Sequence, residues 1–469
     1  MWPTKNDRHL VARGSRTRAV GVGLVLLLLG GCTVATDDAA QTERVPSDPS
    51  QPQLVGQTRP NVLTSDDLYT IYQGVLTSGV QPVDGPQMVA GALKGAHAAA
   101  TEQGLLPVEA AVLDTTWLQA SRDPRTTWAA FGSAYDGFVQ KLGSRMDVSA
   151  IGRGAARGML SAVGDPLTGY LERSAVEARR SARDAAIGVT LTPGSDGEAP
   201  IVRDVEPEGP ADRVGIRAGD VIRAVGDRQS RGLHLYDVLS SLSGAQGSQV
   251  TVTFESPGGR VPRAVTLQRA RVRPAAVSSK LVDGVLLLQL RSFDTGSAAA
   301  VRRALLDSAS AGAVGWVVDV RGNGAGSLTE AASVASLFAG DKVLAIEEEQ
   351  GAQLPVRGTG PALSVQRPLV LLIDGATAGP GELLAGAIRD HELGRVIGTP
   401  SAGRLGTPRL VALSDGSAAE IAIGRMLSPA GRSLLGAGVA PDQTVTVDAQ
   451  ELARGVDRVQ EQGLALAPR

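Results

Sequence analysis

Three predominantly apolar runs in the second half of the chain constrain its fold most strongly: Val285–Leu290, Val314–Val320 and Pro368–Ile373. A helical pattern follows each of them. A strand that is apolar at every position is buried on both faces, and strands that alternate with helices build an α/β layer. The sequence therefore predicts an α/β core over about residues 273–447.

The rest of the chain must form further domains, because 469 residues exceed what one ordinary core holds. The formal net charge is −2, with acidic and basic residues interspersed, whereas nucleic-acid binding usually requires a basic stripe. The four histidines, His9, His97, His234 and His391, lie far apart, and Cys32 is the only cysteine. We therefore expect no nucleic-acid partner, no metal site and no cofactor.

The first 32 residues have the pattern of a signal peptide. Basic residues between Lys5 and Arg18 precede the apolar run Val20–Leu29, which is too short for a transmembrane helix. The two glycines before Cys32 resemble a bacterial lipobox, which implies acylation of this cysteine; an ordinary signal peptide with an incidental cysteine is the alternative. We expect an extracytoplasmic protein, lipid-anchored to the bacterial cell membrane, with a flexible polar tether over residues 33–60.

Residues 61–183 are predicted to be a helical region. Two stretches, residues 68–100 and 128–170, share one plan: a helix, a turn with Val-Asp or Asp-Val, and a second helix with Gly-Ala. The sequence alone leaves open whether they are a diverged internal duplication or two amphipathic hairpins.

The segment Gly209–Ile222 carries the pattern of a third module, predicted over residues 184–272. A short helix is stopped by Gly215, and Gly219-Asp220 makes a turn into a strand. This pattern resembles a PDZ domain, which binds a peptide tail as an added strand. The resemblance implies a set of peptide-binding residues: Ala186, Ile187, Gly188, Val189, Leu191, His234 and Leu239. A PDZ fold that only packs on its neighbour is the alternative.

Three segments together resemble the carboxyl-terminal processing peptidases: Ala156–Leu171, Asp319–Leu328 and Leu413–Asp442. The implied fold class is α+β and multidomain. It combines the helical N-terminal region, a PDZ β-sandwich or barrel and a crotonase-like α/β peptidase core. A C-terminal tail helix is expected over residues 448–469.

The resemblance implies a family mechanism in which a serine is the nucleophile and a buried, neutral lysine is its base. Counting back three residues from Glu382 places the serine position at Gly379, and the lysine position, twenty-five residues later, at Arg404. The glutamine that orients the lysine falls on Pro408. Glycine carries no nucleophile, and arginine remains protonated, so the resemblance implies a degenerate active site.

The remaining site residues are weaker candidates. Thr377, Ser327 and Ser401 are possible substitute nucleophiles, although each also fits a helix cap or a turn. The glycine-rich turn with Gly324, Ala325 and Gly326 stands where the family has its oxyanion-type turn.

Three functions remain open from the sequence. The first is a surface-anchored, non-catalytic family member that binds polypeptide C-termini or unfolded protein segments through its PDZ domain. The second is an active serine-type endopeptidase with a relocated nucleophile. The third is a structural envelope lipoprotein.

Overall fold

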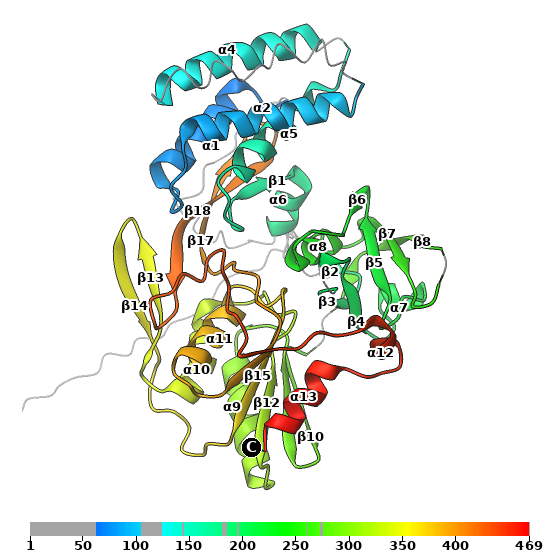
Figure 1. The fold of residues 1–469 in the computed structure, drawn as a ribbon, viewed down its shortest axis with the longest axis vertical. Helices are drawn as coiled ribbons and strands as arrows, with labels where there is room; N and C mark the ends of the chain where they lie inside the picture. The colour runs from blue at the N-terminus through cyan, green and yellow to red at the C-terminus, as the bar shows by residue number, and fades with distance from the viewer. Residues whose placement is uncertain are drawn as a thin grey trace, which may run out of the picture. The chain divides into compact units, whose positions relative to one another are not determined.

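The computed structural model describes residues 62–104, 124–142, 145–180, 185–194, 197–259, 261–272 and 275–468 (Figure 1). These residues belong to one unit, Thr58–Arg469. The predicted signal peptide, the acylation at Cys32 and the tether lie outside the described residues. Within the described ranges, no helix is long and apolar enough to cross a membrane.

Four long helices form the N-terminal helical region: α1 (Ser65–Ser78), α2 (Gly85–Thr101), α4 (Pro124–Leu142) and α5 (Val148–Ser161). Thr64 and Asp67 start α1 as a reciprocal capping box, in which each side chain accepts a hydrogen bond from the other residue's backbone N–H. The apolar faces of all four helices share one buried cluster. Strand β1 (Gly169–Leu171) and helix α6 (Arg173–Arg180) follow.

The predicted PDZ region folds around one antiparallel sheet in the order β3-β4-β5-β7-β8, with β6 beside β5. Its strands are β3 (Val189–Thr192), β4 (Ile201–Val205), β5 (Val221–Val225), β6 (Arg228–Gln229), β7 (Gln249–Glu255) and β8 (Arg263–Gln268). A small pair, β2 (Ala185–Ala186) and β9 (Ala270–Arg271), brings the two ends of the region together. The helices are α7 (Pro210–Arg213) and α8 (Leu235–Leu242), and His234 is the N-cap of α8.

The predicted α/β core contains a six-stranded sheet in the order β10-β11-β12-β15-β16-β19, in which only the β10–β11 pairing is antiparallel. Its strands are β10 (Val277–Val282), β11 (Val285–Leu290), β12 (Gly315–Asp319), β15 (Leu369–Ile373), β16 (Arg395–Gly398) and β19 (Gln443–Thr444). The three apolar runs of the sequence become its central strands β11, β12 and β15. They are buried on both faces, as their composition predicts.

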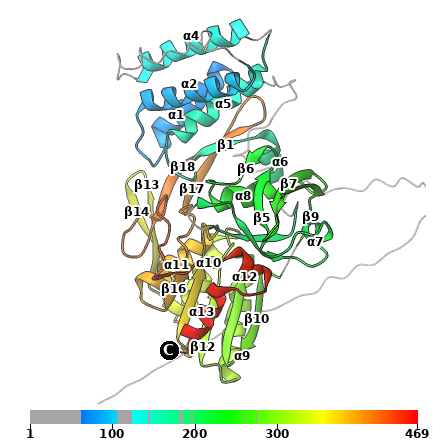
Figure 2. The same ribbon diagram turned by 45° about the vertical axis from the view of Figure 1, so that its right-hand side comes forward.

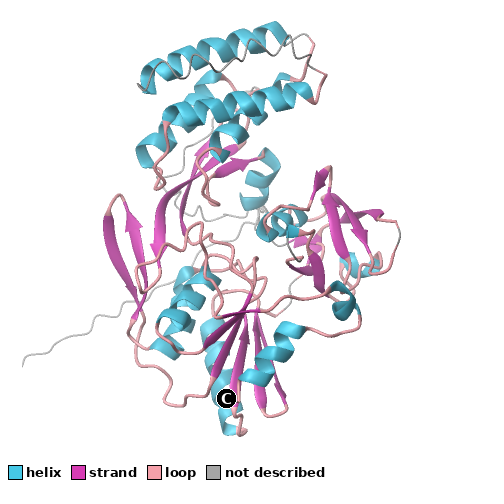
Figure 3. Cartoon of the chain, in the orientation of Figure 1, coloured by secondary structure: helices cyan, strands magenta, loops and turns pink. Residues whose placement is uncertain are grey.

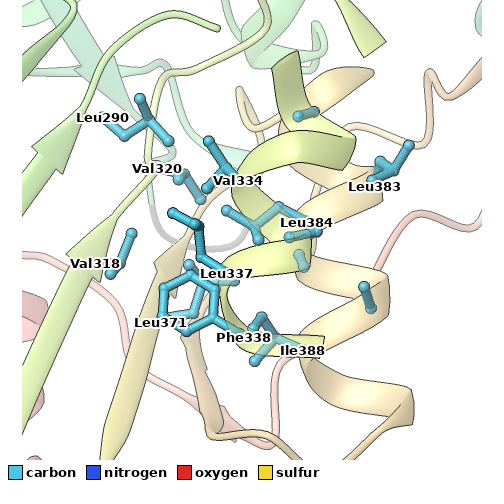
Figure 4. Packing of buried hydrophobic residues seen from close by; sticks show 14 of the residues in the cluster. Leu290, Val318, Val320, Val334, Leu337, Phe338, Leu371, Leu383, Leu384 and Ile388 are labelled. Carbon is cyan, nitrogen blue, oxygen red and sulfur yellow. The ribbon is translucent and has the colours of Figure 1, made fainter. Parts of the chain in front are cut away.

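Two helical layers cover this sheet. Helices α9 (Ser297–Ser310), α10 (Leu328–Ala339) and α11 (Pro380–Asp390) share a buried cluster with one face (Figure 4). Val318 and Leu371 point into it, and Leu337 and Leu384 pack from the helices. The alternate residues of the same strands pack on the opposite face against the C-terminal segment.

A second sheet connects the core with the helical region (Figure 3). Along one edge, β18 pairs with β17; along its opposite edge, it pairs with β1 at one end and with β13 at the other, and β14 pairs with β13. Its core strands are β13 (Val343–Glu349), β14 (Ala352–Arg357), β17 (Gly406–Ala412) and β18 (Ala418–Leu427). The far end of the β17–β18 hairpin joins the helical cluster, because Leu413, Ala419 and Ile421 are buried there. Helical region and core are therefore joined by strand pairing as well as by apolar packing.

The C-terminal segment differs from the single tail helix that the sequence predicts. It forms two helices, α12 (Ala449–Ala453) and α13 (Arg458–Leu466). Gly455, with φ of 81°, ends the first, and the Asp457 carboxylate caps the second. These helices are part of the core: Val459 is buried against the sheet, and α12 lies beside β4 of the PDZ region (Figure 1). Figure 2 shows α12 and α13 from another side.

Candidate functional site

The candidate site is built from two loops at the carboxyl ends of neighbouring strands β12 and β15. The Gly322 amide donates to Asp374 Oδ1 at 2.9 Å, and the Ala378 amide donates to the Asn323 carbonyl at 3.0 Å. Asn323 is fully buried, and its side-chain amide donates to the Leu290 carbonyl at 2.8 Å. The glycine-rich turn after β12 therefore lies directly beside the loop that leads into α11.

The three residues predicted as an oxyanion-type turn make different contacts. The Ala325 amide is turned toward Asn323 Oδ1 at 3.3 Å, and the Ala325 carbonyl accepts from the Phe293 amide. Gly326, with φ of 102°, packs against the backbone of Phe293, where a side chain would overlap it. Gly324 alone faces the second loop, next to the side chain of Ala378.

Gly379, the position of the family's serine, is the N-cap of α11. Its backbone has φ of 47° and ψ of −108°, and a Cβ placed on it would meet no atom within 4 Å. The backbone therefore turns sharply from strand to helix, with open space where a side chain would point. The next residue, Pro380, has no N–H, so the first position of the helix offers no hydrogen-bond donor.

Glu382 holds the site together. Its carboxylate accepts hydrogen bonds from the amides of Gly379, Gly403 and Arg404 at 2.9, 2.6 and 2.8 Å, and from Ser401 Oγ at 2.6 Å. The residue is fully buried. Burial raises the pKa of Glu382 to about 7, although the four donors favour the charged form. From the sequence, Glu382 served only to locate the serine position, and the hydrogen bonds that it accepts were not predicted. Its place as the third residue of a helix, where a glutamate often accepts from the N-cap amide, could have indicated this.

Arg404, the position of the family's lysine, has a side chain 15% exposed. Its guanidinium donates to the Pro166 carbonyl and lies 3.8 Å from Asp237 Oδ1. Its central carbon stands 4.4 Å from the centre of the Tyr236 ring, which is a cation–π contact. Arginine remains charged in such surroundings, so this group acts as a cation and donor rather than as a base.

The sequence did not predict the contribution of the PDZ region to this site. Tyr236 and Asp237 belong to the first turn of α8, and both contact Arg404. The Tyr236 ring also lies against Gly324, because a Cβ there would be 3.0 Å from Tyr236 Cε2. An aromatic ring from α8 therefore occupies the space between the glycine-rich turn and the Arg404 guanidinium.

The three substitute nucleophiles are all engaged in hydrogen bonds. Thr377 is fully buried, and its hydroxyl donates to the Val320 carbonyl at 3.0 Å. Ser327 caps α10 by accepting from the Glu330 amide at 3.1 Å. Ser401 is buried and donates to Glu382, so it has a carboxylate partner that the sequence does not reveal.

The position of the orienting glutamine lies away from the buried part of the site. Pro408 is exposed on β17, at the point where the pairing with β18 shifts register. A proline on an edge strand with a bulge costs no ladder hydrogen bond. No group of three or more His, Cys, Asp or Glu side chains that could hold a metal ion occurs among the described residues.

Comparisons with known proteins cover most of the chain. Residues 284–445 match the family described as Peptidase family S41, and residues 201–256 match the PDZ domain. The chain is 33% identical to the C-terminal processing peptidase, chloroplastic, of Tetradesmus obliquus over 67% of this chain and 72% of that relative. The chain belongs to the carboxyl-terminal processing peptidase family.

A second relative agrees with this membership, and a solved structure agrees with the fold. The chain is 31% identical to the Carboxyl-terminal-processing peptidase 2, chloroplastic, of Arabidopsis thaliana over 61% of this chain and 59% of that relative. The solved structure of the photosystem II D1 C-terminal processing protease superposes with a TM-score of 0.53, at 24% identity, over 87% of this chain and 98% of that one. The predicted family and the predicted fold class, including the PDZ domain and the peptidase core, are confirmed.

Proposed function

We propose that this processing-peptidase family member is non-catalytic and binds polypeptide C-termini or unfolded segments through its PDZ domain. The observation that carries the proposal is the state of the two positions assigned to the family's serine and lysine. Gly379 offers no side chain, and the Arg404 guanidinium is engaged with Pro166, Tyr236 and Asp237. Loss of nucleophile and base together removes rate on the order of 10⁴-fold or more.

The PDZ groove supports the binding half of the proposal. Strand β3 is at the edge of its sheet, and α8 lies against it, so an extended tail has an edge to pair with. Gly188, with φ of 78°, shapes the loop before β3, where we place the terminal carboxylate. Ile187 and Leu191 are fully buried in the PDZ core and support the groove from beneath; Val189 and Leu239 are only partly buried and remain candidates for side-chain contact.

Tail binding without turnover is the expected result. Incubating the chain from Thr33 onward with apolar-ended peptides should give complexes but no cleavage products by mass spectrometry over a long time course. Leu239→Asp should weaken peptide binding about tenfold, because it places a charge in an apolar groove. Ser240→Asp, at an exposed position of the same helix, is the matched control.

Any other result of this peptide incubation would support a different function. Reproducible cuts would contradict the proposal, and the variants Thr377→Ala, Ser327→Ala and Ser401→Ala would identify the nucleophile. Ser401 is favoured among these, because its hydroxyl donates to the Glu382 carboxylate at 2.6 Å. If the protein neither cuts nor binds the peptides, the result would support a structural envelope lipoprotein.

We also propose that the protein is held at the outer face of a bacterial membrane by acylation of Cys32. The support is the sequence pattern before this cysteine. A mature N-terminal peptide that begins at Cys32 and carries lipid mass is the expected finding by mass spectrometry. Cys32→Ser should release the protein from the membrane fraction; unchanged retention would contradict the anchor.

A further inference from the structure

The helical region repeats itself with a constant spacing of 63 residues. Aligning residues 68–101 with 131–164 needs no gap and matches seven identical pairs. These pairs are Tyr72 and Tyr135, Gly74 and Gly137, Asp84 and Asp147, Gly91 and Gly154, Ala92 and Ala155, Gly95 and Gly158, and Ala99 and Ala162. Helices α1 and α2 therefore correspond to α4 and α5.

Burial follows the same spacing. In α2, six buried positions have buried counterparts 63 residues later. They are Met88, Val89, Ala92, Leu93, Ala96 and Ala100, matched by Ile151, Gly152, Ala155, Ala156, Met159 and Val163. Three buried positions of α1, Leu68, Tyr72 and Val75, are matched in α4 by Phe131, Tyr135 and Phe138. The two hairpins thus use the same faces.

The contacts between α2 and α5 are reciprocal. A side chain on Gly91 would overlap the backbone of Gly158, and one on Gly158 would overlap that of Gly91. Gly95 and Gly154 are related in the same way. Because Gly91 corresponds to Gly154 and Gly95 to Gly158, each copy presents the same two glycines to the other. This self-complementary pattern is that of an isologous two-fold interface.

The outer helices of the two copies differ. The Asp67 carboxylate of α1 accepts from the Ser414 amide at 2.8 Å and its hydroxyl at 2.6 Å, and Gly74 lies against Ile421. The counterpart of Asp67 in α4 is Ala130, which is exposed. The counterpart of Gly74 is Gly137, where an added Cβ would meet no atom within 4 Å. Only the first copy therefore holds the β17–β18 hairpin.

We propose that residues 65–101 and 128–164 are two copies of one helical hairpin, paired within this chain. The surface of α5 fits a second copy of the same hairpin, and α1–α2 supplies that copy from the same polypeptide. The first copy thereby covers the face of the second through which a single hairpin would pair with another chain. The helical region therefore does not dimerise through this face, and the protein is a monomer. The reciprocal glycine contacts carry this inference.

Sedimentation of the chain from Thr33, which contains the whole unit Thr58–Arg469, tests it. A monomer mass over the measured concentration range is expected, and a twofold mass would overturn the proposal. Deleting residues 62–123 exposes the glycine face of α5, so this variant should be dimeric at about 10 µM. A folded deletion variant that remains monomeric would also overturn it.

If the deletion variant does not fold, two alanine variants test the close intrachain pairing of α2 with α5. Gly95→Ala introduces a methyl group into the α2–α5 contact and should lower the unfolding midpoint, as should its partner Gly154→Ala. Gly137→Ala, on the open face of α4, is the matched control and should not lower it. Equal midpoints for all three variants would contradict close intrachain pairing.

Discussion

Arg321→Met is expected to lower the free energy of unfolding by about 3–5 kcal/mol, because it leaves buried carboxylates without their cation. The Arg321 guanidinium forms two hydrogen bonds with Asp319, at 2.9 and 2.7 Å, and two with Asp457, at 3.0 and 2.8 Å. The side chains of Arg321 and Asp319 are only 2% and 3% exposed. Denaturant unfolding followed by circular dichroism measures the loss.

The electrostatics of this cluster explain the size of the effect. Burial alone would raise the pKa of Asp319, but Arg321 and Arg203 more than offset it and hold that pKa below its usual value. Burial likewise opposes the charge on Arg321, and Asp319 and Asp457 more than compensate, so the pKa of Arg321 is raised. Each ion is therefore stable only in the presence of the others.

The same substitution should loosen the C-terminal helices. Asp457 is the N-cap of α13, so losing its cation weakens the hold of α13 on the sheet and, through α12, on the PDZ domain. Hydrogen exchange should accelerate first in residues 449–466. Arg409→Met, at an exposed position on β17, is the control and should change stability by less than about 0.5 kcal/mol. A loss below about 1 kcal/mol for Arg321→Met would show that the cluster does not anchor α13.

The sequence predicted the layers of this protein well, because local composition decides them. The strands β11, β12 and β15 are apolar at nearly every position, and that pattern has one stable solution, burial on both faces. The helical pattern that follows each of these apolar runs becomes a helix: α9 after β11, α10 after β12 and α11 after β15. The C-terminal segment was predicted less well, because its division into two helices depends on Gly455 and on contacts with the sheet.

The candidate site was only partly predictable, because half of it comes from distant parts of the chain. Gly379 and Arg404 follow from spacing within one module. Tyr236 and Asp237 reach Arg404 across more than 160 residues, and no local pattern marks such contacts. Arg203 of β4, which is partly buried, likewise lies 3.8 Å from the buried Asp374, and this ion pair joins the PDZ domain to the site loops. The sequence showed that residues 68–100 and 128–170 share one plan but left open whether they are a duplication, and the reciprocal glycine contacts give that plan a structural meaning.

Stability should fall as the pH rises from about 4.5 to 7, and Glu382→Gln should remove the part of this fall that Glu382 causes. The pKa of Glu382 is raised from 4.5 to about 7, so the folded state retains a proton that the unfolded state has lost in this range. The resulting contribution is fully present below about pH 4.5 and lost above about pH 7. Its size is about 3 kcal/mol.

Comparing the two unfolding curves isolates this residue. Burial also raises the pKa of Asp374, which acts in the same direction in both proteins and cancels in the difference. The glutamine variant should therefore gain stability relative to the wild type as the pH rises, measured by urea unfolding at each pH. Glu461→Gln, at an exposed position of α13, controls for the loss of one negative charge.

The outcome also bears on the site itself, because Glu382 is the only acceptor shared by the Gly379 turn and the Ser401–Arg404 turn among the hydrogen bonds of the described residues. A glutamine side chain has one oxygen in place of two, so two of the four donors lose their acceptor. Because Oε1 accepts from Ser401 and Gly403 and Oε2 from Gly379 and Arg404, hydrogen exchange should accelerate in the variant either at the Gly403 amide or at the Gly379 and Arg404 amides. A pH-independent difference between the two proteins would mean that the pKa of Glu382 in the folded state stays near its ordinary value of 4.5, with its four donors offsetting the cost of burial.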